Sequence, residues 1–78
     1  MDKPPNPPRP IGQSWLEQVF ASDTARRGGV VRRKVSDVER EVGVAALELE
    51  VRRRGYHLLR SGGTFIVICR TDPVLVIC

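Results

Sequence analysis

The residues of this chain whose chemistry stands out are cations, and they occur in groups. Five of them lie between Arg26 and Lys34, a stretch that contains no acidic residue. Guanidinium and ammonium groups bind phosphate oxygens, so a surface that gathers them attracts a nucleic acid. The predicted nucleic-acid-binding residues, with DNA as the expected partner, are Arg26, Arg27, Arg32, Arg33, Lys34, Arg53, Arg54 and Arg60.

Acidic residues are concentrated in the segment that follows. Asp37 to Glu50 holds five anions and a single cation, Arg40. The basic stretch can pair with this acidic segment, either inside the fold or between identical subunits. Alternatively, its cations stay free and converge into a patch for a polyanion. The net charge of +4, from 13 Lys and Arg against 9 Asp and Glu, permits nucleic-acid binding without requiring it.

No residue pattern in the chain is typical of catalysis. His57 is the only histidine, and no nucleophile or orienting acid stands in a recognisable arrangement with it. Cys69 and Cys78 lie in apolar runs without metal-ligand spacing. The glycine pairs at 28–29 and 62–63 do not precede a helix with the Lys and Ser or Thr of a phosphate-binding loop. We therefore expect no enzyme, no metal, no cofactor and no small-molecule substrate.

Length and hydropathy predict one soluble domain. A chain of 78 residues has room for one core and buries only about 60% of the surface that its unfolded form exposes, so its stability should be marginal. No stretch approaches the roughly 18 apolar residues of a membrane helix, and the amino terminus lacks the basic and apolar regions of a signal peptide. With no disulfide framework, a cytoplasmic location is expected.

Three regions follow from composition. Residues 1–12 form a proline-rich tail, since the first ten hold five of the six prolines, and this tail is expected to be disordered or extended. Pro4, Pro7 and Arg9 fit the pattern PxxPxR, which is either a ligand for an aromatic groove or a feature of a plain spacer. Residues 13–70 are predicted to form a small α+β domain. Residues 71–78 form an apolar tail or an edge strand.

The first half of the domain is predicted to contain a helix and a strand. Ser14 is suited to cap a helix, with Glu17 completing a capping box, and apolar residues at helical spacing continue to about Ser22. The following DTARRGG has the composition of a turn. Val30, Val31 and Val35 stand around three consecutive cations, and the valines predict a strand with a strongly charged stretch.

The second half is predicted to contain a helical region and a β-hairpin. Ser36 is suited to cap a helical region over residues 37–54, which Gly55 ends. The segment YHLLRSGGTFIVIC predicts two strands joined at residues 61–63. Its second arm, residues 65–69, is apolar throughout and fits a central or fully buried strand. Residues 74–78 are also apolar and can add an edge strand or cover a groove.

Gly43 lies inside the helical region, and two architectures depend on it. If the helix is continuous, it carries two apolar stripes on nearly opposite sides, one for the sheet and one for a second subunit. If the chain turns at Gly43, Val44, Leu47 and Val51 form the single buried stripe of a second helix. The second version needs no partner to account for the apolar residues, and the sequence favours it.

With this turn, residues 14–69 resemble a winged helix-turn-helix domain. The resemblance is carried by the element order, the glycine in the turn (SDVEREVG), the boundary RRRGY, and the glycine-containing hairpin as the wing, paired with the strand of residues 30–34. In this family the second helix of the motif enters the major groove and the wing meets the DNA backbone. The resemblance implies that Ala45, Ala46, Leu49 and Arg53 face DNA, with Arg60 on the wing and Arg32, Arg33 or Lys34 near phosphates.

The chain departs from this family in its candidate recognition helix. Base edges are read best by Arg, Lys, Asn and Gln, but the helix offers Val44, Ala45 and Ala46, followed by Glu48 and Glu50. The arginines at residues 52–54 stand at its far end, where they are suited to helix capping and solubility.

The stretches VRRKVSDVEREVG and EVRRRGYHLL also resemble short uncharacterised bacterial proteins, a resemblance that implies no particular activity. We therefore predict a small winged-helix-like module that binds nucleic acid, as a transcriptional regulator or an accessory protein. The alternative is a protein-interaction or homodimerisation module of strand, helix and hairpin. In that alternative the second helical stripe and residues 74–78 make the contact.

Overall fold

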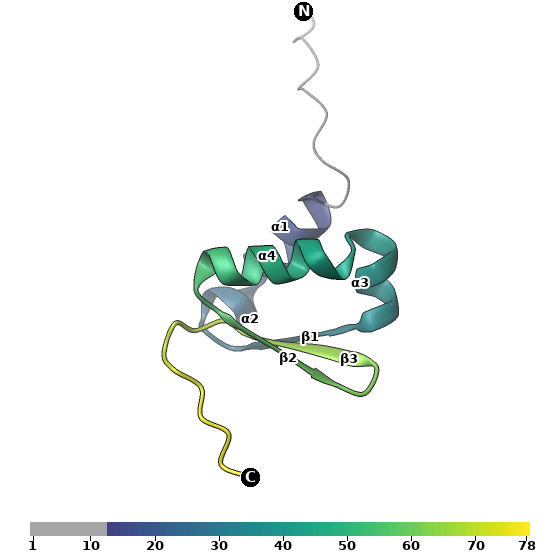
Figure 1. Ribbon diagram of the computed structural model, residues 1–78. Coiled ribbons are helices and arrows are strands. Elements are labelled where there is room, and N and C mark those ends of the chain that lie inside the picture. Colours follow the sequence, from purple (N-terminus) through teal and green to yellow (C-terminus); the bar gives the residue numbers. More distant parts are fainter. Residues whose placement is uncertain (1–12) are drawn as a thin grey trace, which may run out of the picture.

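The computed structural model describes residues 13–78, so the tail predicted for residues 1–12, with its proline-ligand pattern, lies outside the described residues. The fold is α+β, as the sequence predicts, with helices and an antiparallel sheet (Figure 1). In chain order the elements are α1 (Gln13–Ala21), α2 (Asp23–Arg26), β1 (Val30–Lys34), α3 (Val35–Glu41), α4 (Val44–Arg54), β2 (His57–Ser61) and β3 (Thr64–Ile68).

The three strands form one sheet in the order β1-β3-β2. The predicted hairpin is confirmed, because β2 and β3 pair antiparallel and Ser61 stands opposite Thr64 across a two-residue loop. Gly62 takes a φ of 57° there while Gly63 has no positive φ, the combination of a type II′ turn that favours glycine at its first central position. β3 is the central strand, since β1 also pairs with it antiparallel and places Val31 opposite Val67.

The helices gather over one face of this sheet, and the hydrophobic core lies between them (Figure 1). Val38 of α3 is fully buried and Leu47 of α4 is 2% exposed, as each helix turns one apolar stripe inward. Burial of such a side chain stabilises the fold by roughly 1.5–3 kcal/mol. The buried apolar residues are Leu16, Val19, Phe20, Ala25, Val31, Val35, Val38, Leu47, Val51, Phe65, Val67 and Cys69.

The other face of the sheet, here called the outer face, carries no helix of the described chain. Side chains alternate along a strand, so the neighbours of the buried Phe65 and Val67 point outward, and Ile66 is only half-buried. By the strand register, the outer face consists of Val30, Arg32, Lys34, His57, Leu59, Ser61, Thr64, Ile66 and Ile68.

The chain turns at Gly43, so the version with two helices is the observed one. α3 ends at Glu41, and the N–H groups of Val42 and Gly43 both donate to the carbonyl of Val38, at 3.0 and 2.7 Å. Gly43 then takes a φ of 85°, which an L side chain rarely adopts, and α4 begins at the next residue. Val44 is half-buried, and Leu47 and Val51 are buried on α4.

The predicted end of α4 at Gly55 is also confirmed. Gly55 is left-handed, with a φ of 74°. Its N–H donates to Arg52 O at 3.0 Å and the N–H of Tyr56 donates to Val51 O at 3.0 Å, the two hydrogen bonds of a Schellman motif. The motif satisfies carbonyls at the helix end and directs the chain into β2.

Two predicted helix starts are wrong, and one short helix was not predicted. α1 begins at Gln13, so Ser14 lies inside the helix instead of capping it. The DTARRGG segment is not all turn, because Ser22 accepts a hydrogen bond from the N–H of Ala25 and caps the short helix α2.

The second wrong helix start is the cap at Ser36. α3 starts one residue earlier, at Val35, directly after β1. The N–H of Val35 donates to Gly63 O in the β2–β3 turn, at 2.8 Å. A contact between distant parts of the chain therefore fixes this helix start, in place of a local cap.

Glu50 is the one buried charged residue of the described chain, at 8% exposure. Its Oε1 accepts hydrogen bonds from Arg53 Nη2 at 2.8 Å and Arg54 Nε at 2.9 Å. The hydrogen bond from Arg53 is the largest influence on the pKa of Glu50 and lowers it, with help from Arg54 and against the effect of burial, to below the ordinary value of 4.5. The carboxylate is therefore held charged and paired at the carboxyl end of α4.

Gly43→Ala should lower the free energy of unfolding by about 1–2 kcal/mol. An added Cβ would meet no neighbouring atom, but the positive φ of this position is strained for an L residue. Gly63→Ala is the matched control, since Gly63 lies in open space without a positive φ. Urea unfolding of both variants measures the difference. An equal effect of the two substitutions would contradict a conformational role for Gly43.

Glu50→Gln should lower the free energy of unfolding by about 1–2 kcal/mol at pH 7, since it removes the charge from two hydrogen bonds. The pKa of the folded carboxyl is depressed, so its contribution is complete above the ordinary pKa of 4.5 and is lost as the pH falls through the lower, folded value. Urea unfolding from pH 7 to acid should therefore show the variant and the parent converge at low pH.

Glu48→Gln provides the control for that measurement. Its carboxylate pairs with Arg52 at 2.7 Å, but the two side chains are 48% and 76% exposed. Solvent screens such a pair, and the loss should stay at or below about 0.5 kcal/mol. A larger loss for Glu48→Gln than for Glu50→Gln would show that burial of Glu50 does not strengthen its pairs.

Candidate nucleic-acid interface

Four of the eight predicted cations meet where β1 ends and the β2–β3 hairpin turns. Arg33 of β1 and Arg60 of β2 both stand opposite Phe65, one on each side of the central strand. Lys34 is the last residue of β1 and stands opposite Thr64, directly beside the turn. We call the group Arg32, Arg33, Lys34 and Arg60 the wing-end cluster.

The wing-end cluster presents cations on both sides of the sheet. Arg32 and Lys34 project from the outer face, while Arg33 and Arg60 lie on the helical side, where Arg60 stacks 5.9 Å from the centre of the Phe65 ring. Two hydrogen bonds to nearby carbonyls orient the guanidinium groups, from Arg33 to Arg32 O at 2.7 Å and from Arg60 to Gly62 O at 2.9 Å. Such hydrogen bonds leave the positive charges uncompensated.

No cation of the wing-end cluster forms an ion pair with another residue of the region 13–78. Four of the five acidic residues of α3 and α4 are instead paired within their own helices. Arg40 pairs with Asp37 at 2.9 Å and with Glu41 at 3.4 Å, while Glu39 is exposed and has no such pair among the described residues. Basic strand and acidic helices therefore do not neutralise each other inside the described fold. The charge pattern allowed either pairing with the acidic segment or free cations. Pairing inside the fold is not observed for the β1 cations within residues 13–78.

Arg26 and Arg27 lie at the opposite end of β1 from the wing-end cluster. They close α2 and precede the strand, which is about 13 Å long from Val30 to Lys34 by its rise. Both are exposed and have no ion pair among the residues that the structure describes. The structure thus separates six of the eight predicted residues into two groups, one near each end of β1.

A shallow hollow of about 150 Å³ runs along β1 between these two groups. Its polar lining comes from the hydroxyls of Ser22 and Thr24 and from Arg32 and Arg33. The two hydroxyl residues were not identified from the sequence as part of a site. Ser22 precedes DTAR as a potential N-cap, and this signal would have predicted the short helix α2 that carries Thr24.

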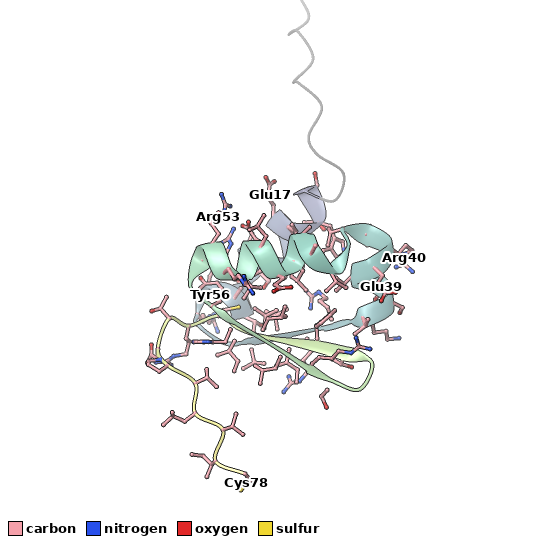
Figure 2. All side chains as sticks on the ribbon, viewed as in Figure 1. Glu17, Glu39, Arg40, Arg53, Tyr56 and Cys78 are labelled. Carbon is pink, nitrogen blue, oxygen red and sulfur yellow. The ribbon has the colours of Figure 1, made fainter. Side chains whose placement is uncertain are left out.

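Arg53 and Arg54, also predicted to bind nucleic acid, are engaged within α4. Both donate to Glu50, and Arg54 in addition stacks over the Phe20 ring at 4.5 Å. Figure 2 shows Arg53 on the side of α4 that faces away from the sheet. A phosphate near these arginines would compete with a carboxylate that is already in place.

The first half of α4 presents few groups that read a base edge. Ala45 and Leu49 are exposed, Leu49 by 69%, and Glu48 stands between them. Ala46 is half-buried against the core. As the sequence predicts, the exposed surface of this helix combines apolar and acidic side chains, so it is suited to contact without base-specific hydrogen bonds.

His57 and Cys69 have structural surroundings. His57 Nε2 lies 2.6 Å from Asp72 O. Because a carbonyl oxygen only accepts, the Nε2–H group donates this hydrogen bond to the C-terminal segment. Burial raises the pKa of the Cys69 thiol, against a smaller opposite effect of Arg54, and the thiol stays protonated at neutral pH. His57 is half-buried at the start of β2, and Cys69 is buried.

Metal sites, membrane helices and known relatives are the remaining indicators of function. Residues 13–78 contain no group of three or more His, Cys, Asp and Glu side chains placed to hold a metal ion. No helix in this part of the chain has the length and apolar character needed to cross a membrane. No protein-family model, curated protein or solved structure matches the chain.

Proposed function

We propose that this chain is a winged-helix-like module that binds nucleic acid, mainly through phosphates. The observation that carries the proposal is the wing-end cluster, whose four cations are free of ion pairs among the described residues and stand at the hairpin and the end of its neighbouring strand. The order of elements and the strand order β1-β3-β2 are those expected of a winged helix, with the Gly62–Gly63 hairpin as the wing.

The physical basis of this binding is release of counterions. A cation that replaces a condensed counterion at a phosphate gains affinity from the entropy of the released ion, independent of sequence. The four cations of the wing-end cluster, extended along β1 by the hollow with the Thr24 hydroxyl, can follow several phosphates of one backbone. Hydroxyl and guanidinium groups both donate hydrogen bonds to phosphate oxygens.

In this proposal α4 contributes shape and apolar contact. Its exposed Ala45 and Leu49 can touch thymine methyl groups or sugar surfaces, whereas Glu48 is repelled by phosphates. Discrimination between DNA sequences should therefore be weak. Such a module is suited to an accessory protein or to a regulator whose specificity comes from elsewhere.

Arg32→Ala/Lys34→Ala should weaken binding to a mixed-sequence DNA duplex by about tenfold or more at low salt. It should also make the plot of log affinity against log salt shallower by about 1.8, or about 0.9 for each phosphate that is no longer neutralised. Fluorescence anisotropy over a salt series measures both quantities. The slope is the diagnostic readout, because misfolding would abolish binding without a regular change in slope.

Arg40→Ala/Arg52→Ala is the matched control, since it removes the same total charge from two arginines that are already paired with carboxylates. Its slope should stay near that of the parent chain. If both double variants change the slope equally, net charge and not the wing-end cluster governs binding. If the parent does not bind DNA at low salt, the proposed function is wrong.

A further inference from the structure

The C-terminal segment Pro73–Cys78, here called the arm, has no charged residue and is largely uncovered. Val74 is 37% exposed, and Leu75, Val76 and Ile77 are 79%, 78% and 85% exposed. The arm leaves the body of the molecule as an extended chain that ends at Cys78 (Figure 2). Consecutive exposed aliphatic side chains of this kind mark a contact surface in a folded protein.

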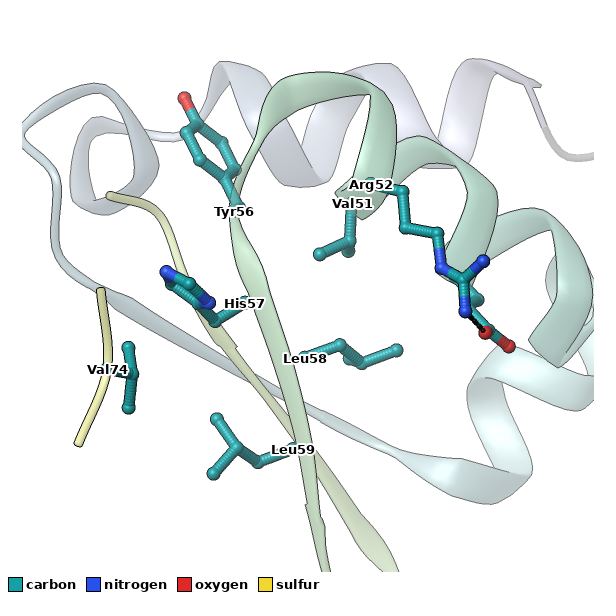
Figure 3. Close-up of a pocket in the computed structure, with 8 residues that line it drawn as sticks. Val51, Arg52, Tyr56, His57, Leu58, Leu59 and Val74 are labelled. Carbon is teal, nitrogen blue, oxygen red and sulfur yellow. Dashed lines mark hydrogen bonds and ion pairs between the residues drawn. The ribbon is translucent and has the colours of Figure 1, made fainter. Parts of the chain in front are cut away.

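A cleft of about 360 Å³ lies along the free edge of β2, between this strand and the second half of α4. Figure 3 shows Val51 and Leu58 on the helical side of β2, with His57, Leu59 and Val74 on the other side. Because residues from both faces of the strand line the cleft, it opens at the strand edge.

The backbone of β2 is also available at this edge. The strand pairs with β3 on one side only, so alternate residues turn their N–H and C=O groups outward. An extended segment can pair with such an edge as an additional strand and place alternate side chains in the adjoining pocket. The cleft therefore combines an unpaired strand edge with an adjoining pocket, as a strand-binding groove does.

The chemistry of the cleft matches that of the arm. Its charged lining residues, Glu48 and Arg52, pair with each other at 2.7 Å and so leave no net charge for an occupant to compensate. Val51, Leu58 and Leu59 supply apolar surface. β2 has five residues, and the arm has five apolar residues after Pro73.

Val74 is the one arm residue that lines the cleft of its own chain, and the arm residues after it do not line the cleft. The carbonyl of Asp72 is held by His57 at the start of β2, and Arg70 pairs with Asp72 at 3.0 Å. From there, the arm could lie beside its own β2 only in parallel, whereas the arm of another copy can take the antiparallel direction, which gives the more stable pairing. In the structure the arm instead runs away from the sheet (Figure 1).

We propose that two copies of this chain form a dimer by exchanging arms, each arm pairing with the β2 edge of the other copy and placing alternate apolar side chains in its cleft. The same two surfaces meet twice, so the assembly closes with two-fold symmetry and leaves no arm exposed. Since three of the four wing-end cations lie on β1, at the opposite edge of the sheet from the contact, the dimer does not depend on nucleic-acid binding.

Sedimentation equilibrium of the full chain tests the dimer. The measurement is made with reductant present, because Cys78 is exposed at the end of the arm and a disulfide there would join two copies by another route. The expected result is a reversible dimer. A monomer at every concentration up to the millimolar range would overturn the proposal and would assign the arm to a different partner.

Three variants locate the contact. Ile77→Glu places a charge on the arm and Leu59→Glu places one at the cleft, and each should raise the dimer dissociation constant at least tenfold. Leu49→Glu is the control, because Leu49 is 69% exposed on α4 but does not line the cleft. Circular dichroism confirms that each variant is folded. Equal weakening by all three would overturn the assignment.

A mixture of Ile77→Glu and Leu59→Glu distinguishes arm exchange from other apolar association. A mixed dimer contains one unaltered arm, from Leu59→Glu, and one unaltered cleft, from Ile77→Glu, so one of its two contacts is complete. The mixture should therefore associate more strongly than either variant alone. A mixture that associates no better than the separate variants would contradict exchange.

Discussion

At Gly43 the backbone takes a φ of 85°, and the positions of α3 and α4 over the sheet depend on this turn. Without it, the segment from Val35 to Arg54 would form one long helix with apolar stripes on opposite sides, and one stripe would lie in water. The turn allows α3 to bury Val38 and α4 to bury Leu47 in the same core. It also brings the chain back through Gly55 to β2, so the hairpin and β1 can form one sheet.

The distribution of charge follows from the same geometry. α4 contains acids and arginines three or four residues apart, so Glu48 and Glu50 pair with arginines of their own helix. These acids are thereby unavailable to the strand that passes beneath the helices. The cations of β1 have no ion pair within the described residues, and the acids of α4 are already paired with arginines of their own helix. Net charge alone would not reveal this division between paired and free arginines.

The parts of the fold that the sequence predicts correctly are those determined locally. Gly55 and the Gly62–Gly63 loop end or reverse the chain through backbone conformations that glycine favours, and both were identified from residue type and position. The start of α3 was not, because a hydrogen bond from Val35 to Gly63, distant in sequence, fixes it. The candidate site is likewise predicted only in part. The run Arg32 to Lys34 is evident in the sequence, but its proximity to Arg60 depends on strand register.

The ion pairs within α4 could not be predicted from spacing. Three consecutive arginines at a helix end are suited to capping, to ion pairing or to phosphate binding, and their spacing is the same in each case. Burial of Glu50 decides the outcome. Its carboxylate is 8% exposed, and an unpaired charge at that burial would cost more free energy than an unpaired charge on an exposed arginine.

The two proposed surfaces are compatible because they occupy opposite edges of one sheet. β1 carries most of the wing-end cluster, and β2 carries the cleft, with β3 between them. Arm exchange at β2 would therefore leave both β1 edges of a dimer open and would join two clusters in one assembly. Since each phosphate contact adds to the dependence of affinity on salt, a dimer that engages both clusters on one duplex would show a steeper dependence than a monomer. Binding and association would then be linked: DNA long enough to span both clusters would favour the dimer, and a duplex covering only one would not.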